Sequence, residues 1–202
     1  MKLVSLLERL EYTCLQGTTD QEVKNVIYDS RKVEEGSLFI CIRGAVVDGH
    51  KFVPDVVAKG AKVLVVEEAV EAPEDVTMIL VKDTRYAMAF ISAAYFGYPA
   101  EKLKTIGITG TKGKTTTTYM VKSILENAGY KVGLIGTIEA IIGDRKIPAK
   151  NTTPESYMVQ EYFHEMVEAG CDCVVMEVSS QGLMLHRTQG FIFDFGIFTN
   201  IE

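Results

Sequence analysis

The sequence predicts an α/β fold in two parts: a small N-terminal α/β domain and a second α/β domain whose sheet is mostly parallel. Three observations support this prediction. Apolar runs of strand length alternate with amphipathic segments of helical length, as in βαβ units. The Gly97–Pro99 break and the charged segment after it divide the chain into residues 1–100 and 101–202. A glycine-rich loop lies between a strand and a helix in the second part.

The elements of the first part follow from the spacing of its apolar residues. Leucines at positions 3, 6, 7 and 10 have helical spacing and predict a short amphipathic helix. A second helix is expected over residues 51–60, and a longer one begins at Asp83-Thr84 and ends at Gly97. Strands are expected over residues 25–28, 37–42, 61–67 and 77–82.

The second part repeats the alternation. Strands are expected over residues 105–109, 131–136, 171–180 and 193–202, and a hairpin over 138–149 turns at Gly143-Asp144. One helix follows the glycine loop to Gly129, and another has Pro154 at its first helical position. A parallel strand normally leads into a covering helix, yet the sequence stops after Thr199-Asn200, so we expect a truncated domain.

Composition excludes several classes of protein. The 202 residues include 21 basic and 27 acidic side chains, and the net charge of −6 argues against a nucleic-acid partner. No run of about 18 apolar residues predicts a membrane span. Four cysteines in a chain of this length do not suggest a disulfide framework. The protein is therefore expected to be cytoplasmic, and its oligomeric state is not indicated.

The strongest motif is the loop Gly110-Thr111-Lys112-Gly113-Lys114-Thr115. Glycines allow backbone N–H groups to surround a phosphate, and the helix that follows directs its positive end toward it. Lys114 is expected to reach the β- and γ-phosphates of ATP, and the Thr115 hydroxyl is expected to ligate Mg²⁺. Ile108 replaces the first glycine of the usual phosphate-loop pattern, and the alternative is a structural glycine turn.

Glu177 is the second candidate. It stands near the carboxyl end of an apolar strand, where α/β sheets carry their ligand groups. A carboxylate among valines and methionines needs a partner that offsets its desolvation, and the magnesium ion of ATP is such a partner. The alternative is a structural carboxylate paired with a lysine or with backbone donors.

Several motifs together resemble one family. T-G-T-K-G-K-T-T at 109–116 is similar to the ATP loop of the Mur ligases. D-S-R at 29–31, G-S-L-F at 36–39 and D-G-H-K-F at 48–52 resemble the UDP-binding domain of its peptidoglycan-stem members. N-T-T-P-E at 151–155 and M-E-V-S-S-Q-G-L-x-x-H-R at 176–187 resemble the branch that extends UDP-N-acetylmuramoyl-L-alanyl-D-glutamate. The resemblance covers essentially the whole chain.

The resemblance implies an ATP-dependent, magnesium-dependent ligase of peptidoglycan and cell-wall synthesis, and hence of cell shape and division. Such an enzyme adds meso-diaminopimelate or L-lysine through an acyl phosphate. Residues 1–100 would bind the UDP-linked dipeptide, and residues 101–202 would form an incomplete ATP-binding domain. The ATP site would comprise Gly110, Thr111, Lys112, Gly113, Thr115, Thr116 and the catalytic Lys114, with Thr115 and Glu177 holding the metal. The substrate site would comprise Tyr28, Ser30, Ala45, Val46, Val47, Asn151, Thr152, Thr153, Ser179 and Arg187.

Two departures and three alternatives accompany this interpretation. Gln181 stands where the family usually has histidine, and Leu185 stands where the family often has glutamine. The family chain also continues beyond residue 202, so the present chain alone is expected not to complete amide-bond formation. The alternatives are a noncatalytic module that binds ATP or a UDP-sugar, another Mur-type ligase, and a small-molecule kinase. Asp194-Phe195-Gly196 spells the kinase metal motif, but it lies in a strand-like run without the other kinase loops.

Overall fold

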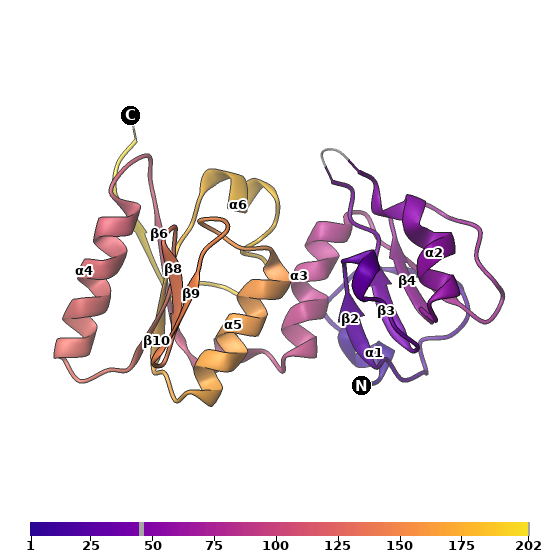
Figure 1. The fold of residues 1–202 in the computed structure, drawn as a ribbon, viewed down its shortest axis with the longest axis horizontal. Helices are drawn as coiled ribbons and strands as arrows, with labels where there is room; N and C mark the ends of the chain where they lie inside the picture. The colour runs from indigo at the N-terminus through magenta and orange to yellow at the C-terminus, as the bar shows by residue number, and fades with distance from the viewer. Residues whose placement is uncertain (45–46, 202) are drawn as a thin grey trace. The chain divides into compact units, whose positions relative to one another are not determined.

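The computed structural model describes residues 1–44 and 47–201, and the chain divides into two compact units, Met1–Tyr95 and Phe96–Glu202. Each unit has its own sheet, one of five strands and one of six (Figure 1). Most strand pairs in both sheets are parallel, so the predicted α/β class is confirmed.

The sheet of the first unit has the order β1-β5-β4-β3-β2. Its strands are β1 (Thr13–Gln16), β2 (Asn25–Ile27), β3 (Ser37–Ile40), β4 (Val63–Val66) and β5 (Thr77–Leu80). Strands β2 to β5 are parallel, and β1 is an antiparallel edge strand on β5. β1 was not predicted, because three of its four residues are exposed and no apolar run marks it.

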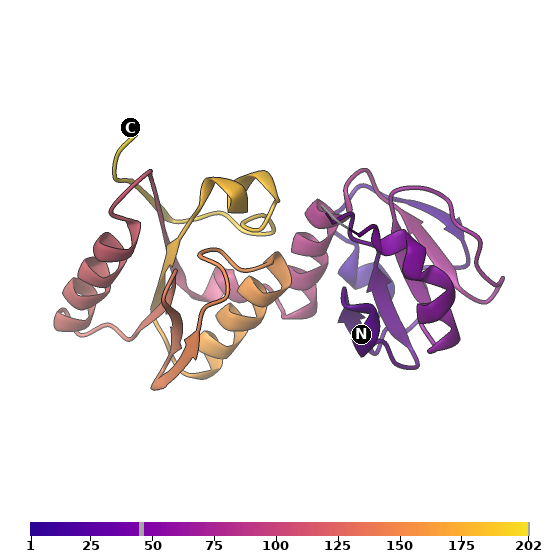
Figure 2. The ribbon, with the colours of Figure 1, turned by 45° about the horizontal axis from the view of Figure 1, so that its top comes forward.

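Helices cover both faces of this sheet. They are α1 (Leu3–Leu6), α2 (Val53–Ala58) and α3 (Thr84–Tyr95), with 3₁₀ turns η1 (Ser30–Lys32) and η2 (Gly49–Phe52). α2 and α3 lie on opposite faces (Figures 1 and 2), which explains why every residue of β3 and β4 is buried. α2 packs Val53 and Val56 against alternate residues of those strands.

The sheet of the second unit has the order β11-β6-β10-β7-β8-β9. Its strands are β6 (Lys104–Thr109), β7 (Val132–Ile135), β8 (Glu139–Ile142), β9 (Arg145–Pro148), β10 (Cys173–Glu177) and β11 (Phe195–Phe198). β11, β6, β10 and β7 are parallel. β8 and β9 form the predicted antiparallel hairpin, in which Ile142 pairs with Arg145 across Gly143-Asp144.

The helical elements of the second unit are α4 (Lys114–Asn127), α5 (Ser156–Glu168), α6 (Ser180–Met184) and the 3₁₀ turn η3 (Pro99–Lys102). α4 and α5 cover opposite faces of the sheet (Figure 1). The prediction that Pro154 opens α5 is wrong, because the helix begins at Ser156 with Glu155 as its N-cap. Arg187 donates hydrogen bonds to the Thr153 carbonyl and to the Glu155 carboxylate. These bonds fix residues 153–155 outside the helix, which therefore begins at Ser156.

Asp194 has a structural role that explains why D-F-G occurs here. Its carboxylate accepts hydrogen bonds from the backbone N–H of Thr105 at 2.8 Å and from Lys104 Nζ at 3.1 Å. These bonds, led by that from the Thr105 backbone, lower the pKa of Asp194 and keep it ionised. The residue therefore ties the start of β11 to β6.

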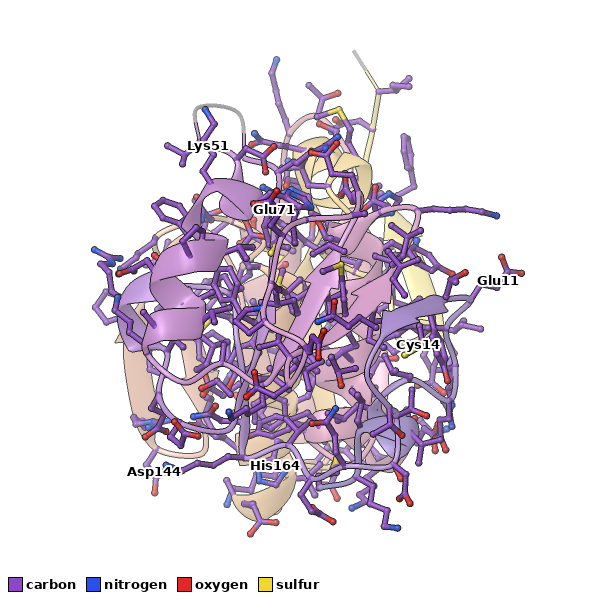
Figure 3. All side chains as sticks on the ribbon, turned by 90° about the vertical axis from the view of Figure 1, so that its right-hand side faces the viewer. Glu11, Cys14, Lys51, Glu71, Asp144 and His164 are labelled. Atoms are coloured by element: carbon purple, nitrogen blue, oxygen red, sulfur yellow. The ribbon has the colours of Figure 1, made fainter. Side chains whose placement is uncertain are left out.

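The four cysteines are free thiols, and only Cys14 is exposed (Figure 3). Burial raises the pKa of the Cys41 thiol to about 12 and also raises that of Cys173. Because the thiolate is the reactive form, we expect a maleimide at pH 8 to label Cys14 rapidly and the buried thiols only after unfolding. Mass spectrometry of native and urea-treated protein checks this, with Cys14→Ser as the control. Rapid labelling of Cys41 in the native protein would contradict it.

Candidate nucleotide and metal site

The candidate site of the second unit lies where three neighbouring parallel strands end. The phosphate loop follows β6, Glu177 is the last residue of β10, and Thr137 follows β7. β10 pairs with both other strands, and Glu177 stands opposite Ile108 of β6. The carboxyl ends of adjacent parallel strands are the usual position for ligand groups in such sheets.

The loop leads directly into α4. Gly113 is the N-cap residue and has φ of +82°, a left-handed conformation that glycine adopts without strain. The first-turn N–H groups of α4 therefore face the loop, as a phosphate site requires. Lys114 Nζ donates to the carbonyl oxygen of Gly110 at 2.8 Å, so its ammonium group folds back over the loop. Thr115 and Thr116 belong to the same first turn.

The loop is tied to the segment after β11. The backbone N–H of Thr111 donates to the Asn200 carbonyl at 3.1 Å, and that of Lys112 donates to Asn200 Oδ1 at 3.0 Å. Thr199 Oγ1 donates to the Lys112 carbonyl at 2.7 Å. A role for Thr199 or Asn200 was not predicted, because the contact joins residues that are nearly 90 positions apart.

Glu177 is fully buried, with 0% of its surface exposed. Its Oε2 accepts hydrogen bonds from the hydroxyls of Thr115 and Thr137, both at 2.9 Å. Its Oε1 accepts the backbone N–H of Thr137 at 3.0 Å. A Cβ on Gly136 would lie 2.5 Å from Oε1, so glycine is needed for this close approach. Thr137 was not predicted, because the sequence does not specify that β7 lies next to β10.

These residues fit a magnesium ion that is shared with a nucleotide. Among the described residues, no basic side chain forms an ion pair with Glu177, so its buried charge has only hydrogen-bond donors around it. Carboxylate and hydroxyl oxygens are the hard ligands that Mg²⁺ prefers, and it commonly takes the rest from phosphates and water. Within residues 1–44 and 47–201, no cluster of three or more His, Cys, Asp or Glu offers a site without a nucleotide.

The 151–153 segment is held against this site. Thr152 Oγ1 lies 3.0 Å from the Thr137 hydroxyl, which joins the segment to Glu177. Thr153 is buried, donates to the Glu177 carbonyl at 3.0 Å and accepts the Ser179 N–H at 2.9 Å. Its hydroxyl is thus used inside the protein, whereas Asn151 is exposed.

Two further predicted substrate residues also make internal contacts. Ser179 Oγ accepts the N–H of Gly182 at 3.0 Å and caps α6, a helix that the sequence analysis did not predict. Arg187, almost buried, donates from Nη1 to the Thr153 carbonyl at 3.0 Å and pairs with Glu155 at 2.7 Å. The structure therefore brings Thr152, Thr153, Ser179 and Arg187 together beside Glu177.

The first unit contains a cleft of about 480 Å³. Its lining includes three of the predicted substrate residues, Tyr28, Ser30 and Val47, and also Phe39 and Phe52. Ala45 and Val46 lie outside the described residues. Arg31 and Asp29 also line the cleft and pair at 2.7 Å, and this hydrogen bond is the main reason that the pKa of Asp29 falls to about 2.

Comparison with known proteins assigns the chain to a family. The profile described as "Mur ligase family, catalytic domain" matches residues 22–96, and the profile described as "Mur ligase middle domain" matches residues 108–202. The chain belongs to the Mur ligase family. Apart from residue 96 at the boundary, each profile match lies within one of the two units.

Individual Mur ligases extend this comparison. The UDP-N-acetylmuramoyl-L-alanyl-D-glutamate–2,6-diaminopimelate ligase of Clostridium perfringens is 53% identical over 201 residues, which are 100% of this chain and 42% of the relative. The enzyme of the same name from Clostridium tetani is 50% identical with the same coverage. A solved diaminopimelate ligase of that name has a TM-score of 0.81 at 21% identity and covers 100% of this chain and 40% of its own, which supports the fold. The chain therefore spans about 42% of the length of the curated relatives it matches.

Proposed function

We propose that the chain forms the UDP-substrate and ATP-binding parts of an ATP-dependent ligase that adds an amino acid to UDP-N-acetylmuramoyl-L-alanyl-D-glutamate. The observation that carries the proposal is the buried Glu177 at the end of β10, whose carboxylate accepts hydrogen bonds from Thr115, next to the phosphate loop, and from Thr137. The names of the relatives favour diaminopimelate as the amino acid. Since ATP and UDP-linked precursors are cytoplasmic metabolites, we expect the reaction there.

The residues of the second unit suit the formation of an acyl phosphate from ATP and a substrate carboxylate. Lys114 would bind the β- and γ-phosphates, and the loop N–H groups would orient them. Thr115 and Glu177 would hold a bound Mg²⁺, which neutralises charge on the phosphates. Thr152 lies within hydrogen-bonding distance of Thr137, and thus next to the site where the carboxylate must meet ATP.

The turnover of ATP tests this proposal. In a ligase that contains this chain together with the remaining length of its relatives, we expect ADP release that depends on UDP-N-acetylmuramoyl-L-alanyl-D-glutamate. ATP binding without such turnover would favour the noncatalytic module, and transfer of phosphate to a free hydroxyl would favour a kinase. The amino acid is tested in the full-length ligase by comparing diaminopimelate with lysine.

The cleft of the first unit is proposed to hold the UDP end of the substrate. In the Ser30→Phe variant, the larger side chain on η1 would occupy part of the cleft. We therefore expect UDP to bind at least tenfold more weakly, a loss of affinity that corresponds to roughly one good contact. ATP affinity should stay unchanged, because its candidate site is in the other unit. Lys32→Ala is the matched control, since Lys32 is exposed on the same turn and does not line the cleft. Equal UDP affinity in Ser30→Phe and the parent would contradict the assignment.

A further inference from the structure

One wall of the cleft lies between β3 and the first residue of η2, where the structure describes residues 41–44 and 47–49. Gly44, Val47 and Gly49 of this wall line the cleft. Two backbone bonds close it, from Gly44 N–H to the Val47 carbonyl at 2.9 Å and from Gly49 N–H to the Ile42 carbonyl at 2.8 Å. Any ligand in the cleft therefore meets a wall whose position depends on what holds residues 43–44 and 47–49.

His50 lies behind that wall and is only 8% exposed. Its Nε2 is 3.0 Å from the backbone nitrogen of Glu67, and its Nδ1 is 2.6 Å from Asp48 Oδ1. Because a backbone N–H can only donate, Nε2 is the acceptor, and the ring carries its proton on Nδ1, toward Asp48. Both ring nitrogens are thus engaged inside the protein. His50 connects the residue after β4 to Asp48 and is not among the described residues that line the cleft.

Charged groups extend this connection on both sides. Glu67 Oε1 accepts the N–H and the hydroxyl of Thr84, both at 2.8 Å, which joins it to the start of α3. Arg43 lies 3.3 Å from Asp48 and 3.5 Å from Glu67, and it pairs with Glu68 at 2.8 Å. Burial opposes the ionisation of Asp48, but hydrogen bonds from His50 and the nearby charges outweigh it and lower the pKa of Asp48.

We propose that His50 is a positioning residue for nucleotide binding: it fixes the cleft wall formed by residues 43–44 and 47–49 by linking Asp48 to the backbone of Glu67. The inference rests on the proposed function, which assigns the cleft to the UDP end of the substrate. If the wall is already ordered before binding, the binding free energy does not include the conformational entropy cost of ordering the wall. Arg43 acts in the same way from the solvent side.

Calorimetric titration of the chain with UDP, and separately with ATP and Mg²⁺, tests the inference. We expect His50→Ala to bind UDP about tenfold more weakly with ATP affinity unchanged. His50→Gln should recover part of the loss, because its side-chain oxygen can accept the Glu67 N–H. Lys51→Ala is the matched control, since Lys51 is exposed on the same turn (Figure 3) and should leave both affinities unchanged.

Amide hydrogen exchange supplies a readout that does not need the ligand. In His50→Ala the amides of Gly49 and Glu67 should exchange faster, whereas amides of β4 should keep their protection. If His50→Ala fails to fold, Arg43→Ala serves instead, because the Arg43 side chain is 46% exposed and its loss leaves the core intact. We expect it to weaken UDP binding about threefold or more.

The outcomes separate the two proposals. A parent chain that does not bind UDP overturns the assignment of the cleft, and with it the nucleotide role of His50. A parent that binds UDP while the folded His50 and Arg43 variants bind equally well overturns the positioning role alone. Weaker UDP binding accompanied by equal weakening of ATP binding also overturns it, because that pattern reports general loss of structure.

Discussion

Replacing Lys114 with alanine is expected to weaken ATP binding by one to two powers of ten, with or without magnesium. The ammonium group already lies over the loop, 2.8 Å from the Gly110 carbonyl, where the phosphates of a bound nucleotide would be enclosed. A charge-assisted hydrogen bond of this kind contributes about 1.5–3 kcal/mol, which corresponds to that loss of affinity. Calorimetric titration with ATP, once with Mg²⁺ and once with EDTA, measures it.

Lys112→Ala is the matched control, because it removes the same charge from the same loop. Lys112 is exposed and contributes its backbone N–H and carbonyl to the contacts with Asn200 and Thr199, which the substitution leaves in place. We expect a loss of about threefold or less, since exposed charges are screened. Equal losses in the two variants would mean that Lys114 acts only through the net charge of the loop.

The sequence predicted the parts of the fold that depend on local patterns. The buried strands β3, β4, β7 and β10 are short apolar runs, and their boundaries differ from the prediction by a few residues. The phosphate loop was predicted from its glycine–lysine–threonine motif after such a run, and Glu177 as the acidic residue near the end of one. Apolar periodicity carries this information because burial of a strand on both faces requires it.

The remaining features depend on contacts between distant residues. β1 is exposed, and its pairing with β5 joins residues 13 and 80. Thr137 and Asn200 join the site through strand neighbours that the sequence does not specify. Thr153 was predicted from the family resemblance to touch substrate, but nothing in the sequence indicates that its hydroxyl is bonded to Glu177 and Ser179. Single-residue patterns contain no signal for such pairings.

Replacing Glu177 with glutamine is expected to remove the magnesium contribution to ATP binding while leaving the fold intact. The amide can keep a hydrogen bond to each group that Glu177 contacts, with the two threonine hydroxyls accepting instead of donating. Its oxygen can accept the Thr137 N–H in place of Oε1, and its NH₂ group can donate to the hydroxyls of Thr115 and Thr137 in place of Oε2. The Thr137 hydroxyl proton then turns to Thr152. The thermal midpoint should therefore stay the same or rise, because a buried charge without a cation partner is removed.

The test is a titration with ATP in the presence of Mg²⁺ and again in EDTA, together with a melting curve. We expect Glu177→Gln to weaken ATP binding about tenfold or more with Mg²⁺ and hardly at all in EDTA, since a neutral amide is a poor ligand for a hard cation. Thr115→Val should likewise weaken ATP binding only when Mg²⁺ is present, whereas Lys114→Ala should weaken it under both conditions. If Glu177→Gln binds ATP and Mg²⁺ as well as the parent does, Glu177 is a structural carboxylate. A large fall in the melting temperature would likewise show that its charge, and not its shape, holds the three strand ends together.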